Sequence, residues 1–173
     1  NNTACGYSTL ELNTTGTANV AVGAYALDAN TTANNNSALG YGAMSGNTTG
    51  SENTGIGRYA LKNNTTGTSN SALGYNAMDA NTTGAYNTAV GNIALDANTE
   101  GDHNCAFGQT ALGANTTADY NVAFGSNSLA DNTTGANNCA FGATALISNT
   151  TGARNIAVGR QALQAVTTAN DLT

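Results

Sequence analysis

Apolar and polar residues recur along this chain with a fixed period of seventeen residues. Counted from Asn2, each unit reads N-x-A-h-G-x-x-A-L-x-x-N-T-T-G-x-x, where h is Val, Leu, Ile, Phe or Cys. Such strict self-similarity indicates one supersecondary unit stacked on copies of itself. We therefore expect a single repeat domain over residues 2–171. Its ten units begin at Asn2, Asn19, Asn36, Asn53, Asn70, Asn87, Asn104, Asn121, Asn138 and Asn155.

The length of the unit selects the fold class. Helical solenoid repeats need about 33 residues or more, because each repeat holds two helices. Gly, Asn and Thr are also weak helix formers, and they dominate this unit. The pattern predicts an all-β fold, a parallel β-solenoid (β-roll) of ten coils with short strands between Gly and Asn corners. At a strand spacing of ~4.8 Å, these coils make a rod roughly 48 Å long.

The strand is expected at positions two to five of each unit. Alternation places the Ala at position three and the larger residue at position four on opposite faces. We expect the larger residue to fill the interior, together with Leu or Met at position nine. Phe107, Phe124 and Phe141 then belong to the core. The Gly at position five shares a face with the Ala, forming a smooth strip that another backbone can approach; alternatively, it supplies a positive φ at a corner.

The Asn at position twelve predicts a structural ladder. Asn tolerates turn conformations, and identical amides stacked in register can hydrogen-bond from one coil to the next. The N-T-T triplets also match the glycosylation sequon, but their repetition at one phase favours a corner role. The ladder residues are Asn13, Asn30, Asn47, Asn64, Asn81, Asn98, Asn115, Asn132 and Asn149.

Composition and charge argue against several functions. The net charge of −6 is spread along the chain without a basic patch, so we expect no nucleic-acid partner. No apolar run approaches the ~20 residues that cross a bilayer, so we expect no membrane insertion by this segment. The chain starts one residue before a repeat and ends just after another, which suggests a piece of a longer fibre protein.

The sequence offers little for catalysis or cofactors. The only histidine, His103, stands at the variable position seventeen and makes a poor partner for a nucleophile. Cys5, Cys105 and Cys139 form no C-x-x-C pair, and Cys105 and Cys139 are too far apart along the stack for a disulfide. We interpret them as buried small residues. The chain is therefore expected to be non-enzymatic, without cofactor or metal.

Candidate ligand contacts lie among the variable positions, where most charges form solvated rims. Tyrosines occupy position six or seven of the first five units, and such a row of exposed rings suits stacking against sugars or packing of ring on ring. The row is Tyr7, Tyr25, Tyr41, Tyr59 and Tyr75.

The predicted core is thin, with two large apolar side chains in each coil. A lateral partner that covers the Ala/Gly strip would add buried area, and a cyclic homo-oligomer is the simplest arrangement. We therefore expect the chain itself to be its first partner.

The stretch from Asn19 to Leu27, Asn-Val-Ala-Val-Gly-Ala-Tyr-Ala-Leu, resembles the head repeat of YadA-type trimeric autotransporter adhesins. N-T-A-V-G runs followed by N-T-T-G also resemble phage-type tail-fibre repeats. The resemblance covers all ten units, although the present coil is longer. It implies parallel β-rolls packed side by side as a homotrimer, outside a cell or on a virion. The implied function is a structural, adhesive fibre segment that attaches to a host surface through a glycan or protein receptor.

Two alternatives remain open. Regular Thr columns can order water, so an ice-binding β-solenoid is the second hypothesis, with only one Thr of each pair facing outward. The third is a filament subunit that joins end to end through open strand edges.

Overall fold

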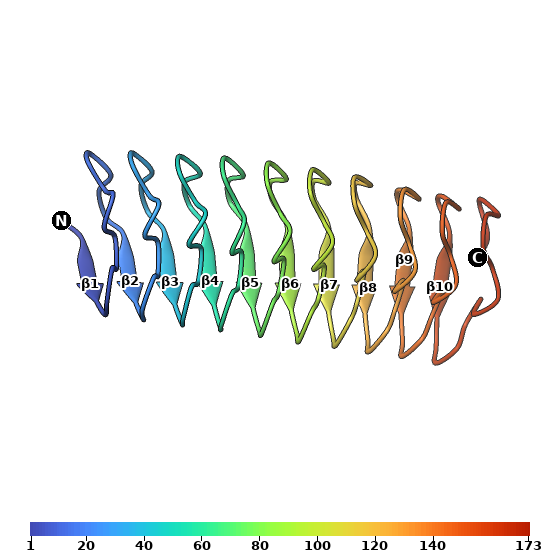
Figure 1. The fold of residues 1–173 in the computed structure, drawn as a ribbon. Helices are drawn as coiled ribbons and strands as arrows, with labels where there is room; N and C mark the ends of the chain where they lie inside the picture. Colours follow the sequence, from blue (N-terminus) through green and yellow to red (C-terminus); the bar gives the residue numbers. More distant parts are fainter.

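The computed structural model describes residues 1–173 and contains ten strands, one in each coil. Figure 1 shows them along a rod with the chain termini at opposite ends. Each strand covers positions two to four of its unit. The strands are β1 (Thr3–Cys5), β2 (Val20–Val22), β3 (Ser37–Leu39), β4 (Thr54–Ile56), β5 (Ser71–Leu73), β6 (Thr88–Val90), β7 (Cys105–Phe107), β8 (Val122–Phe124), β9 (Cys139–Phe141) and β10 (Ile156–Val158). The predicted parallel β-solenoid is confirmed.

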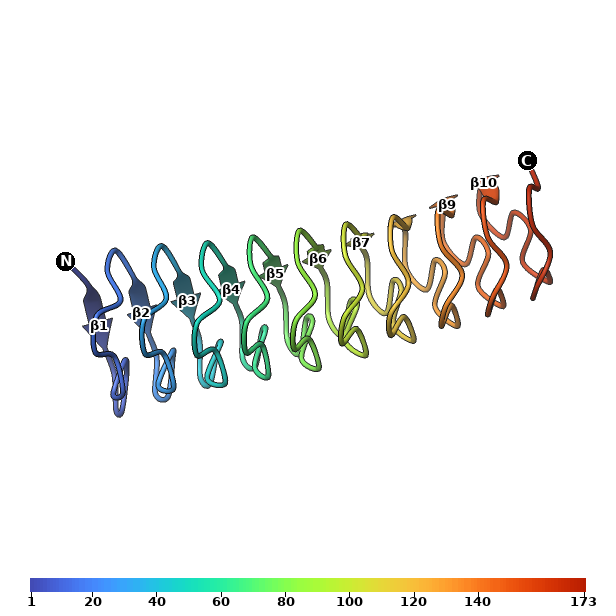
Figure 2. The ribbon, with the colours of Figure 1, turned by 90° about the horizontal axis from the view of Figure 1, so that it is seen from above.

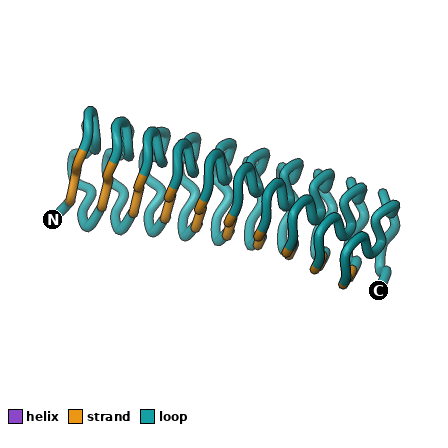
Figure 3. The backbone as a smooth tube through the Cα atoms, turned by 90° about the horizontal axis from the view of Figure 1, so that it is seen from below, coloured by secondary structure: helices purple, strands orange, loops and turns teal.

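The strands form one parallel sheet in sequence order. Their register is offset by one unit, so that Ala4 pairs with Ala21 and Ala21 with Ala38. Figure 2 shows the successive turns of the chain, and Figure 3 shows that most of each turn lies outside the strands. Backbone hydrogen bonds also join those segments from coil to coil, as when the Leu27 N–H donates to the Ala43 carbonyl at 3.1 Å. The structure contains no helix long and apolar enough to cross a membrane.

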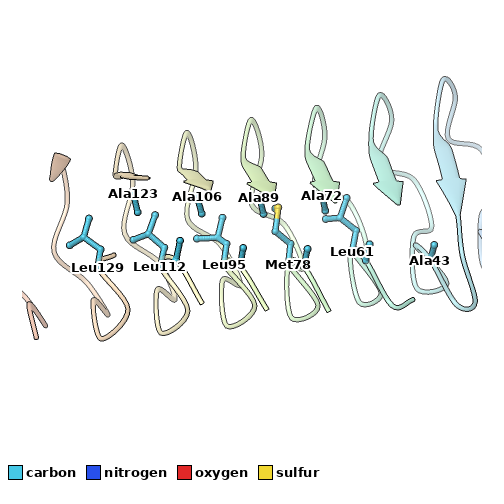
Figure 4. Packing of buried hydrophobic residues seen from close by; sticks show 14 of the residues in the cluster. Ala43, Leu61, Ala72, Met78, Ala89, Leu95, Ala106, Leu112, Ala123 and Leu129 are labelled. Carbon is cyan, nitrogen blue, oxygen red and sulfur yellow. The ribbon is translucent and has the colours of Figure 1, made fainter. Parts of the chain in front are cut away.

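The core is a narrow row built from three positions of each coil. Ala at position three, Ala at position eight and Leu or Met at position nine supply all 23 residues in its single cluster. Figure 4 shows Ala89 and Ala106 of the strands pointing toward the row formed by Met78, Leu95 and Leu112. The predicted role of position nine is confirmed, whereas the contribution of position eight was not anticipated.

The expectation that position four fills the interior is wrong. Ala89 is fully buried, whereas Leu39 and Phe141 are 50% and 52% exposed. The space opposite the strand is already filled by position nine, so only a small residue fits at position three. Gly55 illustrates this limit, since a Cβ there would lie 2.8 Å from Cγ of Met44. Alternation then turns position four outward, and Phe107, Phe124 and Phe141 stack outside the core.

The Gly at position five forms a corner with φ between 121° and 145° in every coil. A Cβ on Gly6 would lie 2.6 Å from the carbonyl oxygen of Gly23 in the next coil. Positive φ and close backbone approach therefore both require glycine, but the approach is between coils of one chain. The predicted Ala/Gly strip for another chain is wrong, because its Ala side chains face inward.

Three other positions of each coil also adopt left-handed backbone conformations, almost always without glycine. In the second coil these are Tyr25 at φ 61°, Leu27 at 51° and Asn35 at 59°. Each costs roughly 1–2 kcal/mol in an L-residue. Hydrogen bonds between coils hold them, as when the Tyr25 N–H donates to the Tyr7 carbonyl at 2.8 Å. The left-handed turn at position seven includes Tyr25 and Tyr59 of the predicted tyrosine row and directs their side chains.

Candidate functional site

The structure brings the predicted tyrosines together along one edge of the rod. Tyr7, Tyr25, Tyr41 and Tyr59 pack edge to face, with ring centroids 5.4–5.6 Å apart and interplanar angles of 72–77°. The row alternates between positions six and seven, so successive rings leave the backbone from different points. Tyr41 and Tyr75 remain 47% and 43% exposed. The row is thus both a packed ladder and an accessible aromatic surface.

Two cations lie on this tyrosine row. The guanidinium carbon of Arg58 is 4.7 Å from the ring centroid of Tyr59, 5.9 Å from that of Tyr41 and 5.8 Å from that of Tyr75. Nζ of Lys62 lies 4.9 Å from the Tyr59 centroid. All four distances are within the ~6 Å range of cation–π attraction. Arg58 therefore links Tyr75 to the rest of the row.

A second aromatic stack lies at position seventeen and was not anticipated. His103 is sandwiched between Tyr86 and Tyr120, with centroids 4.9 and 4.8 Å apart and rings parallel within 5°. The signal in the sequence was the presence of rings at the same position of three consecutive units. The stack gives His103 a structural role in holding adjacent coils together.

The outward face of the sheet, which we call the strand face, combines an apolar row at position four with apolar, Ser or Thr residues at position two. It consists of positions two and four of all coils, and no charged residue occurs at either position. Leu73 and Phe124 at position four are 47% and 45% exposed, and Val20 at position two is 44% exposed. Phe107, Phe124 and Phe141 stack along it at 5.2 and 4.8 Å. A long, uncharged strip of this kind marks an interaction surface more readily than scattered apolar residues do.

The three cysteines lie on the strand face. All have free thiols; Cys5 is exposed, and Cys105 and Cys139 are half-buried. The interpretation of these residues as buried is wrong, because they occupy the outward positions two and four. Burial raises the pKa of the Cys105 thiol, which disfavours the reactive thiolate.

The Asn residues at position twelve form a hydrogen-bonded ladder. The Asn81 side chain donates to Oδ1 of Asn64 at 2.7 Å and to the Gly84 carbonyl at 3.0 Å. Asn98 donates in turn to Oδ1 of Asn81 at 2.9 Å. The ladder ends where Val166 replaces Asn, which leaves Oδ1 of Asn149 buried without a partner. The function of this ladder is therefore to satisfy buried polar groups.

A second Asn ladder, at position one, was missed. The Asn36 backbone N–H donates to Oδ1 of Asn19 at 3.0 Å, and the Asn19 side chain donates to the Ala33 carbonyl at 2.8 Å. Both side chains are buried. The sequence signal was present, since Asn opens every unit.

The two Thr columns differ in exposure and bonding. Hydroxyls at position thirteen donate hydrogen bonds to the backbone of the next coil, as when Thr65 donates to the Thr82 carbonyl at 3.0 Å. Position fourteen is exposed in every coil, and the hydroxyl of Thr83 has no protein partner. The second column therefore offers free hydroxyl groups to solvent along the rod, whereas most hydroxyls of the first column bond to the next coil.

Three carboxylates at position ten are less exposed to solvent than the sequence pattern predicted for charged residues. Asp28, Asp79 and Asp96 are half-buried, and burial raises the pKa of each. Repulsion from Asp79 contributes further to the raised pKa of Asp96. For these residues the prediction of a fully solvated rim is wrong.

The raised pKa of Asp96 predicts a pH-dependent stabilisation by Asp96→Asn. A raised folded-state pKa means that stability falls as pH rises from the ordinary value of 3.8 through the folded pKa. At pH 7 the variant should be more stable than the native chain, by less than about 1 kcal/mol because solvent screens a half-exposed group. Urea unfolding at several pH values measures this difference, which should vanish below pH 3.8. Asp131→Asn, at an exposed carboxylate, is the matched control; an equal gain there would contradict the burial argument.

The structure shows neither a pocket nor a group of three or more His, Cys, Asp or Glu residues arranged to hold a metal ion. The candidate surfaces are instead flat columns: the strand face, the tyrosine row with its two cations, and the exposed Thr column. Comparison with protein-family models, curated proteins and solved structures finds no match to this chain.

Proposed function

We propose that this chain is a non-catalytic segment of a structural, adhesive fibre in which three copies pack side by side through the strand face. The fibre is displayed outside a cell, at its surface or on a virion, and attaches to a host surface. The observation that carries this proposal is the uncharged, half-exposed row of large apolar residues at position four that runs from the second coil to the tenth.

The dimensions of the strand face favour a partner. Ten coils at ~4.8 Å and three strand residues at ~3.3 Å give a strip of roughly 500 Å². The whole strip, in which five coils carry Ser or Thr at position two, is thus of the same order as the largest apolar patch on typical monomers, about 300–600 Å². Patches of that size are often functional. A three-fold arrangement lets the strips of all copies meet around one axis and excludes water from each. The contact between copies is therefore proposed at positions two and four, not at the Ala/Gly positions first expected.

The adhesive part of the proposal rests on the resemblance to trimeric adhesin heads and tail fibres and on the tyrosine row. With the strand face directed toward the other copies, a row at a different edge remains available to a receptor. A glycan or protein at the host surface is the proposed partner.

Acidic substitutions on the strand face should dissociate the assembly without unfolding the chain. In Leu73→Asp/Phe124→Asp, every copy carries two charges into a desolvated interface, and charge burial without a partner is costly. We expect the dissociation midpoint to rise at least about 100-fold in concentration, equivalent to about 5.5 kcal/mol per trimer, because the dissociation constant of a trimer scales with the square of this concentration. Sedimentation velocity measures this change, and circular dichroism checks the fold.

Thr83→Asp/Thr134→Asp is the matched control for this substitution. It places the same charges in the same two coils at position fourteen, where the chain already carries the exposed Glu100. The control should assemble like the native chain. Equal assembly of both double variants would rule out the strand face as the interface.

A second candidate function, ice binding, is favoured by the exposed Thr column. Nine of its ten positions are Thr, with Glu100 the exception, and stacking repeats them at the coil spacing. Thermal hysteresis of the purified protein that is lost in Thr66→Lys/Thr83→Lys would support this function. Its absence from the native chain would dismiss it.

A further inference from the structure

One segment of the tyrosine row combines exposed aromatic rings, which can stack on a ligand, with cationic side chains, which can attract an anion. We call it the Arg58 platform and define it as Tyr41, Arg58, Tyr59, Lys62 and Tyr75. These residues come from three consecutive coils, so the platform extends over roughly 10 Å along the rod. The rings of Tyr41 and Tyr75 are nearly half exposed, and Arg58 is exposed between them.

Neither cation of the platform forms a salt bridge, although the carboxylate of Asp79 in the next coil attracts Lys62. The only salt bridge of the protein joins Arg154 to Asp171 at 2.6 Å. Arg58 instead lies among three tyrosine rings, and Lys62 lies over one of them. Two of the four Lys and Arg residues of an otherwise acidic chain are therefore gathered in one coil beside aromatic rings. The exposed charge of Arg58, which has only tyrosines as its charged or titratable neighbours, favours an anionic ligand over a neutral one.

The rings restrict the kind of anion. Exposed aromatic surface favours a ligand with an apolar face of its own, as the C–H face of a pyranose ring provides. A guanidinium group matches a carboxylate geometrically, through two parallel N–H to oxygen hydrogen bonds. Tyrosine hydroxyls add donors and acceptors for sugar hydroxyls. A small inorganic anion would use only the cations, and a neutral sugar would use only the rings.

We propose that the Arg58 platform binds carboxylated sugar units of an acidic polysaccharide. The sugar ring stacks on Tyr41 or Tyr75, and its carboxylate accepts hydrogen bonds from Arg58, with Lys62 adding electrostatic attraction. The absence of a pocket agrees with an extended chain lying on a flat surface. This inference rests on the proposed adhesive function, because it names the class of receptor.

The test is calorimetric titration of the full chain with a hexamer of galacturonic acid, with tyrosine fluorescence as a second readout. The protein has seven Tyr and no Trp, so its fluorescence reports on the five rings of the tyrosine row and on the two tyrosines of the second aromatic stack. A neutral glucose hexamer and poly-glutamate serve as comparison ligands. We expect the uronate hexamer to bind at least tenfold more tightly than either. Failure of the native chain to bind it, or equal binding of poly-glutamate, would overturn the proposal.

Two pairs of variants localise the binding. Arg58→Gln should weaken uronate binding at least tenfold, whereas Arg160→Gln, at the same position of the last coil but without neighbouring tyrosines, should not. Tyr75→Leu should weaken binding severalfold, whereas Tyr120→Leu in the other stack should not. Equal affinity within either pair would contradict the assignment.

The light-scattering mass of each sample separates this proposal from the assembly it rests on. A trimer that does not bind the uronate would overturn the sugar site alone. A monomer that binds it at Arg58 would sustain the site and contradict the fibre.

Discussion

Gly91→Ala should lower the free energy of unfolding by at least about 3 kcal/mol. Gly91 has φ 142°, which costs an L-residue about 1–3 kcal/mol. A Cβ there would also lie 2.6 Å from the carbonyl carbon of Gly108 in the next coil. That contact is with backbone, so relief requires two coils to separate, and overpacking costs about 1–3 kcal/mol more. Because each coil contacts only its neighbours, the damage should centre on the sixth and seventh coils.

Urea unfolding measures the loss for Gly91→Ala, and amide hydrogen exchange locates it. Gly113→Ala is the control, because Gly113 has no positive φ and Ala130 occupies the same position one coil later. Its Cβ would lie 2.8 Å from the Thr110 methyl and 3.3 Å from the Thr110 carbonyl oxygen, both within its own coil. We expect it to stay within about 1 kcal/mol of the native chain. A similarly small effect for Gly91→Ala would show that coils do not approach one another as closely as described.

Asn81→Ala should cost about 3–5 kcal/mol of unfolding free energy. The substitution removes three buried hydrogen bonds, to Asn64, to Gly84 and from Asn98. Each buried polar group left without a partner costs about 1–3 kcal/mol, and the missing amide leaves a void besides. Asn98 still donates to the Gly101 carbonyl at 3.0 Å, which keeps the total below the sum of three complete losses.

The same urea measurement compares the Asn ladder with an exposed residue of the same turn. Thr83→Ala removes a side chain two residues away that is exposed and makes no hydrogen bond, so it should change stability by less than about 0.5 kcal/mol. Asn81→Asp keeps the size of the side chain but removes its donor, and it should be at least as harmful as Asn81→Ala. An Asn81→Asp variant of native stability would mean that the amide bonds contribute little.

The repeat made the solenoid and its parallel register predictable, because the fixed period of seventeen residues places equivalent residues of every coil side by side. The inward face of the strand was not predictable from alternation alone, which is symmetrical between Ala at position three and the larger residue at position four. The informative signal was constancy across units. Position three is Ala in every unit but one, and Gly55 replaces it where Met44 takes the space, whereas position four varies from Cys to Phe. A core of fixed width tolerates less variation in volume than a surface does.

The left-handed residues could not have been found from the sequence. Positions seven, nine and seventeen carry residues as different as Tyr59, Leu95 and His103, and glycine marks only Gly42 among them. Their conformations are imposed by hydrogen bonds between coils, which are tertiary interactions. The sequence therefore predicted which tyrosines belong to the row. It did not predict their edge-to-face packing or the connection through Arg58, because both depend on these conformations.

The mass of the native chain in solution, measured by light scattering after size-exclusion chromatography, tests the central claim most directly. Side-by-side packing of three copies through the strand face predicts three times the 17.2 kDa of one chain. A mass of 17.2 kDa across the accessible concentration range would leave the strand face exposed to water and would contradict the proposed fibre.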